Sequence, residues 1–362
     1  MHGLTLCGVE KIQFATDLAD PQIENATDVV VLVDRSGICG SDLHQYHGRE
    51  SVSEGTIPGH EFVGEVVAIG DRVRRFSVGD YVFSPFSTSC GACYFCETGL
   101  SARCQHSQIF GYLPPAGVKD EGRGIQGAQA QWVRVPLADT TLLPVPNRED
   151  PEQALLLGDN FTTGFYCADS GGIRPGDLTV VLGCGAVGLS AICAAWYLGS
   201  GVVVAVDLVE SRLQRAESLG AIVVLPDAAH DCLMEHSSRR GYRGADNVLE
   251  AVGLPAAQQL AFQLVRPGGV ISAVGMHTAS QFEFSPADAY NRNLTYRAGR
   301  CPVRSYLDRI LTAVGNGDLS VPTEQIVTHR HVPLSDGAAA YRMFSQRDDD
   351  CVKVVFSRES TR

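Results

Sequence analysis

The feature that most constrains this chain is a short glycine-rich segment between an apolar run and a helical pattern. The segment follows the apolar residues 178–182 and reads Gly183-Cys184-Gly185-Ala186-Val187-Gly188. The apolar spacing of residues 187–198 predicts a helix after it. Residues 202–206 predict the next strand, and Asp207 ends it, 19 residues after Gly188. A strand, a glycine-rich turn, a helix and an acidic residue in this order are typical of a dinucleotide-binding unit.

Each position of this fingerprint has a physical role. Gly183 permits the tight turn, Gly185 lets the backbone approach the pyrophosphate, and Gly188 lets helix and strand pack closely. The helix begins near Ala186 and Val187, and its N-terminus is expected to face the phosphates. The alternative is a glycine-rich turn that binds nothing, but the flanking strand and helix favour the cofactor site.

Asp207 indicates which dinucleotide binds. Its carboxylate can accept hydrogen bonds from the adenosine ribose hydroxyls of NAD, and it would repel the 2′-phosphate of NADP. Arg212 is the counter-argument, because a nearby arginine could hold that phosphate. Charge repulsion at close range favours NAD.

The hydrophobic pattern divides the chain into two kinds of structure. Residues 29–135 show short apolar runs separated by Gly, Pro and Ser, which is typical of strands and turns. From residue 178 strands alternate with helical segments, which predicts a parallel, doubly wound sheet. Residues 111–127 are rich in Gly and Pro and are expected to form a loop. We therefore expect an α/β chain with a mostly β domain, 1–161 and 299–362, and a dinucleotide-binding domain, 162–298.

Four of the twelve cysteines lie close together in the sequence. They are Cys90, Cys93, Cys96 and Cys104. Four thiolates at this spacing suit a closed, tetrahedral zinc site, which has no open position for chemistry. Four free cysteines on a loop are the alternative, but the regular spacing favours zinc over both free thiols and disulfides.

Net charge and hydropathy limit the kinds of partner that this chain can have. The formal net charge is −12, which argues against nucleic acid or an anionic membrane as a partner. No apolar run approaches the roughly 20 residues that a membrane span needs, and the first ten residues do not resemble a signal peptide. We expect a cytoplasmic protein that acts on a small molecule.

Two further segments complete a resemblance. They are Gly37-Ile38-Cys39-Gly40-Ser41-Asp42-Leu43-His44 and Pro58-Gly59-His60-Glu61. Together with the four cysteines and the fingerprint, in this order, the chain resembles the zinc-dependent alcohol dehydrogenases of the medium-chain dehydrogenase/reductase superfamily over nearly its whole length. The resemblance implies a GroES-like catalytic domain interrupted by a Rossmann domain, and a homodimer or homotetramer.

The resemblance also implies the ligands of a second, catalytic zinc. Cys39 and His60 match the first two ligands of the family. Asp159 stands at the third position, whereas the commonest pattern of the family has two Cys and one His ligand; this departure resembles the branch of formaldehyde dehydrogenases and related polyol and secondary-alcohol enzymes. An aspartate that caps the following helix is the alternative for Asp159. The expected content is two zinc ions per chain.

The remaining site residues follow from the same match. Ser41 resembles the hydroxyl that hydrogen-bonds the substrate oxygen, and His44 the outer end of a proton relay. Asp42 and Glu61 resemble carboxylates that orient or tune the metal ligands. Lys353 is expected either at the cofactor pyrophosphate or in solvent.

The implied reaction is hydride transfer between NAD and an alcohol or its carbonyl product. Two alternatives stay open at this point. One is an enzyme that retains NAD through an internal redox cycle, as a dismutase does, or a non-redox enzyme on the same fold. The other is a zinc- and NAD-binding protein without catalysis, because fold alone does not define function.

Overall fold

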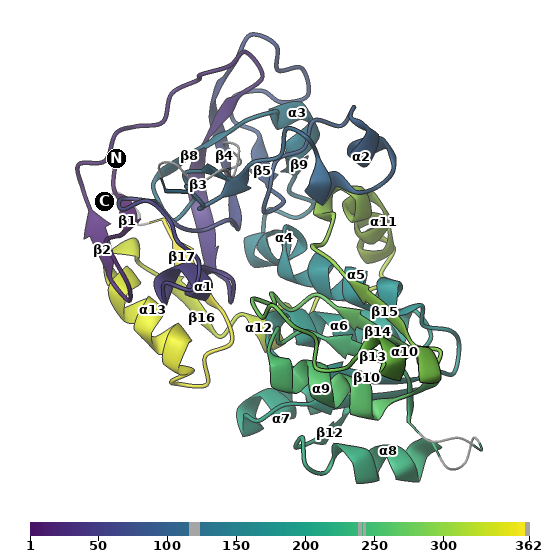
Figure 1. Cartoon of the computed structure of the whole chain (residues 1–362). Coiled ribbons are helices and arrows are strands. Elements are labelled where there is room, and N and C mark those ends of the chain that lie inside the picture. The colour runs from purple at the N-terminus through teal and green to yellow at the C-terminus, as the bar shows by residue number, and fades with distance from the viewer. Residues whose placement is uncertain (116–123, 238–240, 242–243, 359–362) are drawn as a thin grey trace. The chain divides into compact units, whose positions relative to one another are not determined.

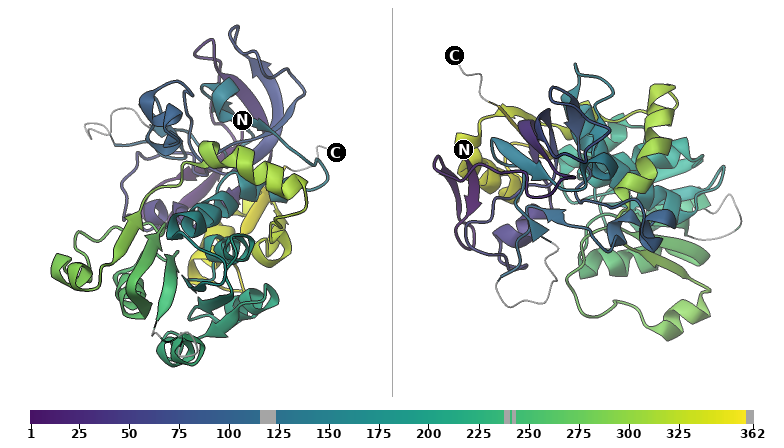
Figure 2. Two further views of the ribbon diagram at one scale, coloured as in Figure 1. Left: turned by 90° about the vertical axis from the view of Figure 1, so that its right-hand side faces the viewer. Right: turned by 90° about the horizontal axis from the view of Figure 1, so that it is seen from above.

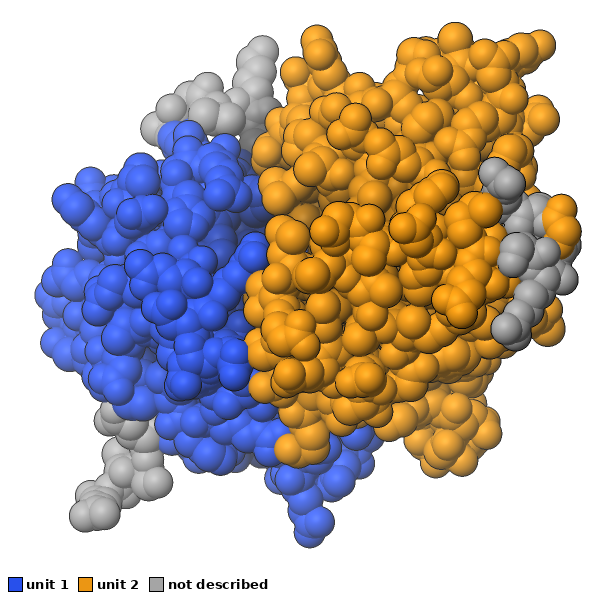
Figure 3. Space-filling model, turned by 90° about the horizontal axis from the view of Figure 1, so that it is seen from below, with its two compact units in different colours: residues 1–159, 302–308, 327–362 blue, residues 160–301, 309–326 orange. Residues whose placement is uncertain are grey.

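The computed structural model describes residues 1–115, 124–237, 241 and 244–358, and these form two compact units. Unit 1 is made of Met1–Asp159, Pro302–Asp308 and Val327–Arg362. Unit 2 is made of Asn160–Cys301 and Arg309–Ile326. Figure 3 colours the two units separately.

A seven-stranded sheet organises unit 1 (Figure 1). Its strands, in spatial order, are β16 (His329–Val332), β17 (Val354–Ser357), β3 (Val29–Ile38), β4 (Phe62–Ile69), β5 (Tyr81–Phe83) and β9 (Leu143–Pro144), and β8 (Trp132–Val135) also pairs with β3. All pairs are antiparallel except β16 with β17. The last pair between β3 and β4 joins Ser36 to Phe62. The residues just beyond that pair on either strand are therefore neighbours.

Shorter elements surround this sheet. Two small sheets pair β1 (Gly3–Leu6) with β2 (Ile12–Ala15) and β6 (Ile109–Phe110) with β7 (Gly124–Ile125). The α-helices of unit 1 are α1 (Asp42–Tyr46), α2 (Tyr94–Glu97), α3 (Ala138–Thr141), α4 (Pro151–Leu157) and α13 (Gly337–Gln346). Single 3₁₀ turns occupy Ser101–Arg103 and Leu334–Asp336.

Alternating side chains build the core of unit 1. Val29, Val31 and Val33 of β3 point to one side, where they join a buried cluster with Phe62 and Val66 of β4. Burying branched side chains on one face of a pleated strand is the main driving force for such a sheet. A second cluster lies under α13 and contains Ile38, Tyr46, Tyr341, Phe344 and Val354.

Unit 2 is built on a six-stranded parallel sheet. Its strand order is β12 (Ile222–Val224), β11 (Val202–Val206), β10 (Leu178–Leu182), β13 (Ala245–Glu250), β14 (Val265–Ala273) and β15 (Thr295–Ala298). The order reverses between β10 and β13, so the carboxyl ends of these strands form the switch point where ligands bind in such sheets. The apolar runs at residues 178–182 and 202–206 therefore became central strands.

Helices cover both faces of this sheet (Figure 2). They are α5 (Asn160–Gly171), α6 (Ala186–Tyr197), α7 (Glu210–Ser218), α8 (Ala229–Ser237), α9 (Pro255–Leu264) and α10 (Pro286–Asn291). Contacts link α5 to α6 and α6 to α7, while α8 packs against α9. Parallel strands need crossover connections, and crossovers on either side of the switch point account for the two layers. The prediction of an α/β chain with a doubly wound parallel sheet is confirmed.

Two further helices and one expected loop lie outside the two main sheets. Helix α11 (Val303–Gly315) and helix α12 (Thr323–Ile326) follow the sheet of unit 2. The sequence analysis did not predict α4, although Asp150 and Pro151 mark its start: the Asp150 carboxylate accepts a bond from the Gln153 amide, and proline favours the first helical position. Of the loop expected over 111–127, residues 116–123 lie outside the described residues. No helix in the described part of the chain is long and apolar enough to cross a membrane.

Candidate metal centres and cofactor site

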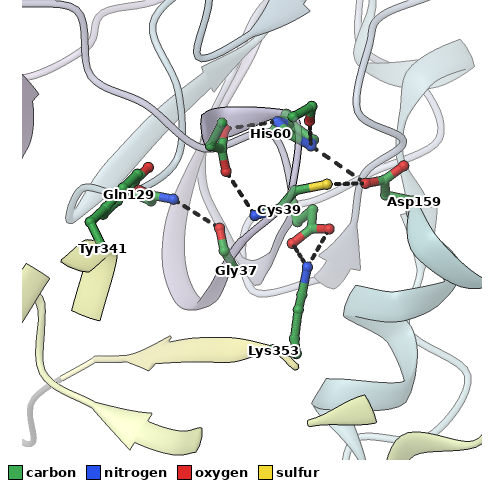
Figure 4. Close-up of polar contacts among 10 residues, drawn as sticks. Gly37, Cys39, His60, Gln129, Asp159, Tyr341 and Lys353 are labelled. Atoms are coloured by element: carbon green, nitrogen blue, oxygen red, sulfur yellow. Dashed lines mark hydrogen bonds and ion pairs between the residues drawn. The ribbon is translucent and has the colours of Figure 1, made fainter. Parts of the chain in front are cut away.

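Three predicted ligands, Cys39, His60 and Asp159, come together in unit 1 (Figure 4). The Asp159 Oδ2 atom lies 3.4 Å from Cys39 Sγ and 3.4 Å from His60 Nε2. One ligand atom of each, and one of Glu61, all lie within 4.8 Å of one another. A zinc with bonds of about 2.0 to 2.3 Å separates its tetrahedral ligands by roughly 3.5 Å. The atoms present are therefore spaced to hold one such ion.

The local fold explains this convergence of distant residues. Cys39 follows the end of β3, and His60 lies just before β4, next to the last pair of that ladder. Asp159 follows α4, which packs against both β3 and β4. Asp159 is 7% exposed, so its carboxylate is buried and needs partners.

Asp42 connects the first two ligands. Its Oδ1 atom lies 3.2 Å from His60 Nδ1, and its Oδ2 atom accepts a 2.9 Å hydrogen bond from the Cys39 amide. A carboxylate on Nδ1 fixes the imidazole so that Nε2 faces the site, as in carboxylate–histidine–zinc arrangements. Asp42 is 2% exposed, so the arrangement is shielded from water.

The carboxylate of Glu61 forms a buried ion pair with the ammonium of Lys353. The Lys353 ammonium donates to both carboxylate oxygens of Glu61, at 2.5 Å to Oε1, and both side chains are 1% exposed. The expectation that Lys353 reaches the pyrophosphate or solvent is wrong for this structure. The pairing of β17 with β3 sets Val354 opposite Ile38, and this places the neighbouring Lys353 beside Glu61.

The charges of the site call for a bound cation. Burial raises the pKa of the Cys39 thiol, and the nearby carboxylates of Asp159 and Glu61 raise it further. Burial opposes the charged form of His60, but Asp42 and Asp159 outweigh it and raise the pKa of this imidazole well above its ordinary value. Burial also raises the pKa of Glu61 to about 7, against the opposing effect of Lys353. A divalent ion would relieve this concentration of acidic groups.

Of the two residues of the predicted proton relay, Ser41 lies next to these ligands. Ser41 Oγ is 3.4 Å from His60 Nε2. His44 lies on α1 and is half-buried, and its Nδ1 atom is buried without a hydrogen-bond partner among the residues that the structure describes. Burial lowers the pKa of His44, and Arg49 and His47 lower it further. A neutral imidazole with an unpaired nitrogen is suited to accept a proton.

The four clustered cysteines form a second group in unit 1. Their sulfur atoms all lie within 4.8 Å of one another, and Cys93 and Cys96 are 3.7 Å apart. Zinc–sulfur bonds of about 2.3 Å place tetrahedral sulfurs about 3.8 Å apart. Backbone amides of Cys90 and His106 point at Cys104 Sγ, each at 3.3 Å. Amides from Gln105 and Cys96 lower the pKa of Cys93 to about 6, so the group fits a zinc ion held by thiolates.

The fingerprint of unit 2 lies at the carboxyl end of β10. Gly183 has a φ of +89°, and a side chain on Gly188 would collide with the Gly183 carbonyl. At Gly185 an added Cβ would meet nothing closer than Arg212 Nη1, at 3.8 Å. No side chain of a described residue caps the N-terminus of α6, which begins at Ala186 and continues with Val187. Open space before uncapped amides fits a pyrophosphate.

Asp207 lies beside this turn. Its Oδ2 atom accepts a 2.6 Å bond from the Cys184 amide, and its Oδ1 atom accepts bonds from the amides of Leu208 and Val209. A carboxylate has about four acceptor positions, so these three bonds leave capacity for a ribose hydroxyl. The amides hold the negative charge at the edge of the turn.

Sequence analysis missed two buried residues behind the metal ligands, Gln129 and Tyr341 (Figure 4). The Gln129 amide donates to the Gly37 carbonyl at 2.9 Å, and the Tyr341 hydroxyl donates to Gln129 Oε1 at 2.8 Å. Both side chains are fully buried. An isolated glutamine and tyrosine carry no sequence signal for this role, because the contact joins residues 212 positions apart.

Comparison with known proteins agrees with this geometry. Residues 25–147 match the alcohol dehydrogenase GroES-like domain, and residues 186–307 match the zinc-binding dehydrogenase family. The chain is 33% identical to the uncharacterized zinc-type alcohol dehydrogenase-like protein AdhB of Bacillus subtilis (strain 168), over 98% of this chain and 99% of the relative.

Two solved structures are similar over almost the whole chain. The alcohol dehydrogenase TADH from Thermus sp. ATN1 is 36% identical, with a TM-score of 0.88 over 99% of each chain. A structure described as an NAD-dependent alcohol dehydrogenase is 26% identical, with a TM-score of 0.82 over 99% of this chain and 100% of the other. The expected resemblance and the GroES-like fold are therefore confirmed.

Proposed function

Because this chain belongs to the zinc-dependent alcohol dehydrogenases of the medium-chain dehydrogenase/reductase superfamily, we propose that it oxidises an alcohol, or reduces its carbonyl product, with NAD at a zinc ion held by Cys39, His60 and Asp159. The observation that carries the proposal is the spacing of these three ligand atoms, with Asp159 Oδ2 3.4 Å from both of the others. A zinc ion held by these three protein ligands would keep an open position for the substrate.

The two cofactors divide the chemistry between them. When bound, zinc supplies a Lewis acid that makes the alcohol proton acidic, and NAD supplies the hydride acceptor. The chain's own residues orient these groups and move the proton. Asp42 holds His60 through Nδ1 and Cys39 through its amide, so neither ligand is free to rotate away.

Proton transfer is assigned to Ser41 and His44. The Ser41 hydroxyl lies next to His60. Its Oγ atom can accept the alcohol proton while the hydroxyl donates its original proton onward. The Nδ1 atom of His44, which has no hydrogen-bond partner in the described part of the chain, can then take up a proton, because burial lowers the pKa of this imidazole and favours its neutral form. Positioned proton acceptors of this kind contribute about 10²- to 10⁴-fold to a rate.

The dinucleotide is assigned to unit 2. The turn Gly183-Cys184-Gly185 and the first amides of α6, at Ala186, Val187 and Gly188, hold the pyrophosphate. The Asp207 carboxylate accepts hydrogen bonds from the adenosine ribose hydroxyls. Arg212 lies near the same turn, next to Gly185. The similar NAD-dependent alcohol dehydrogenase supports NAD as the cofactor.

The second zinc is assigned to Cys90, Cys93, Cys96 and Cys104, and its role is structural because four thiolates fill its coordination shell. We assign unit 1 to the catalytic domain, expected at 1–161 and 299–362, and unit 2 to the cofactor domain, expected at 162–298. Residues 309–326 cluster with unit 2. Cytoplasmic localisation stays part of the proposal.

The test measures absorbance at 340 nm with NAD and a panel of primary, secondary and polyol alcohols. Wild-type protein should form NADH with at least one alcohol. His60→Ala should abolish this activity, whereas His331→Ala, which changes an exposed histidine of the same unit, should retain it. Equal activity of the His60→Ala variant would contradict the proposed site.

We also propose that copies of the chain associate through β15, as a dimer or within a tetramer. This strand ends the sheet of unit 2 and has no neighbour on its outer side among the described residues. Tyr290 and Phe282 are 83% and 60% exposed, and Phe282 packs on Tyr296 of β15 with ring centroids 5.2 Å apart. Light scattering should show an oligomer, and Tyr290→Lys with Phe282→Lys should shift it toward monomer; a monomeric wild type would refute this assignment.

A further inference from the structure

We propose that Gln129, held by Tyr341, positions the two chain segments that carry the catalytic zinc ligands Cys39 and His60. This inference rests on the proposed function, because it concerns the same zinc site. It assigns a role to two residues that touch neither the ligand atoms nor the expected substrate. Gln129 and Tyr341 are therefore positioning residues.

The backbone around Gln129 is attached to the segment that leads to His60. The amide of Gln129 donates to the Pro58 carbonyl at 3.0 Å, and the amide of Ala128 donates to the Gly59 carbonyl at 2.9 Å. Gly59 has a φ of +92°, and an added Cβ there would lie 2.5 Å from the Gln129 Cγ atom. Close approach of the two segments therefore requires glycine immediately before His60.

The side chain of Gln129 reaches the other ligand segment. Its Nε2 atom donates to the Gly37 carbonyl, two residues before Cys39. The ladder between β3 and β4 ends at Ser36 and Phe62. One further backbone bond, from the Gly37 amide to the Glu61 carbonyl at 3.2 Å, joins the two ligand segments beyond it, and Gln129 adds a second connection. Gln129 joins them just beyond that end, with its backbone on one segment and its side chain on the other.

Tyr341 fixes the orientation of the Gln129 amide. An amide group can rotate by half a turn and exchange its oxygen and nitrogen. The Tyr341 hydroxyl donates to Oε1, which leaves Nε2 to donate to Gly37. Tyr341 and Gln129 are both fully buried, so water cannot replace either bond. Helix α13, which carries Tyr341, is thus connected to the zinc site.

Two variants and one control test this role. Gln129→Met keeps the length of the side chain and removes both hydrogen bonds. Tyr341→Phe removes only the hydroxyl. Tyr81→Phe is the control, because it removes a half-buried tyrosine hydroxyl bond of the same unit, to Asp34 at 2.6 Å, outside both ligand segments.

The main readout is the rate at which the catalytic zinc passes to a chelator, with the zinc of the four cysteines as an internal reference. Loss of outer partners weakens metal binding about 10- to 100-fold. We expect about tenfold faster release for Gln129→Met, a smaller increase for Tyr341→Phe, and wild-type release for Tyr81→Phe. Cobalt placed in the catalytic site should show altered visible absorption bands in the first two variants only. Their kcat should fall while KM for NAD stays unchanged.

The outcomes separate this inference from the proposed function. If wild-type protein holds a chelatable second zinc, and folded Gln129→Met or Tyr341→Phe releases it at the wild-type rate with unchanged cobalt bands, the inference is overturned alone. A lower melting temperature with unchanged zinc release would also overturn it, because the role would then be only structural. Tyr341→Phe decides the matter if Gln129→Met does not fold. Wild-type protein with zinc at the four cysteines only would overturn the proposed function and the inference together.

Discussion

The ammonium of Lys353 donates to both carboxylate oxygens of Glu61, although each side chain is only 1% exposed. This pair lies against Gly37, where any side chain would collide with the Glu61 carboxylate. A buried ion pair of this kind is costly to break, because the remaining buried charge loses the partner that contacts it directly. The pair therefore connects Lys353, just before the last strand of unit 1, to Glu61, which follows the metal ligand His60.

Removing one member of this pair should destabilise the protein strongly. We expect Lys353→Met to lower the free energy of unfolding by about 3 to 5 kcal/mol, measured by urea denaturation. The double variant Lys353→Met with Glu61→Gln should recover much of that loss, since no unpaired charge stays buried. Lys11→Met, at an exposed lysine, is the control and should have little effect. A double variant as unstable as the single one would argue against this account.

Asp159 should be required for one of two zinc ions. Wild-type protein is expected to contain two zinc ions per chain by metal analysis, and Asp159→Asn about one. Asp150→Asn is a matched control, because Asp150 caps α4 without facing the metal ligands. If Asp159→Asn kept full zinc and lost only a little stability, Asp159 would be a helix cap and not a ligand.

The four-cysteine site should contribute to folding more than to catalysis. Cys93→Ala should lose one zinc ion and lower the unfolding free energy by several kcal/mol, on the order expected when a structural zinc is lost. Cys7→Ala changes a half-buried cysteine outside both metal groups and should leave zinc content and stability unchanged. A Cys93→Ala protein as stable as wild type would remove the case for a structural zinc.

Asp207 should select NAD over NADP by at least about tenfold in kcat/KM, which needs only about 1.4 kcal/mol. The carboxylate is fixed by three backbone amides and cannot turn away from a 2′-phosphate. Close-range repulsion between this carboxylate and the 2′-phosphate exceeds the free energy needed for a tenfold preference, even at an effective dielectric constant of about 20. Kinetics with both cofactors measure the preference. An Asp207→Ser variant no better with NADP than wild type would show that another residue, such as Arg212, sets the choice.

A pH-dependent stability is expected from His277 and Glu250 in unit 2. His277 Nε2 lies 2.8 Å from Glu250 Oε2, and this hydrogen bond raises the pKa of His277 above its ordinary value. A group whose pKa is raised by folding stabilises the fold below its unfolded pKa, near 6.5, and loses that contribution as pH rises through the folded value. His277→Asn should therefore destabilise the protein by about 1 kcal/mol at pH 6 and by much less at pH 9. An equal loss at both pH values would exclude this ion pair as the cause.

The sequence alone determined the features that depend on local spacing. The alternation of apolar runs with a helical period predicted the parallel sheet of unit 2, because each strand must be buried on both faces. The fingerprint from Gly183 to Gly188 marked the turn after β10, since the positive φ of Gly183 and the close contact at Gly188 both require glycine. The four cysteines likewise lie within one short segment, so their spacing limits where their sulfurs can be.

Only the tertiary structure decided which distant residues share one environment. Cys39, His60 and Asp159 were connected by a family resemblance, but their mutual distances depend on how β3, β4 and α4 pack. Lys353 was misjudged because the strand pairing that buries it beside Glu61 joins residues 292 positions apart. Gln129 and Tyr341 gave no signal at all, since a buried amide and a hydroxyl acquire a role only when the folded chain brings a partner to each. Local patterns determine secondary structure, whereas burial and partner choice follow from long-range packing.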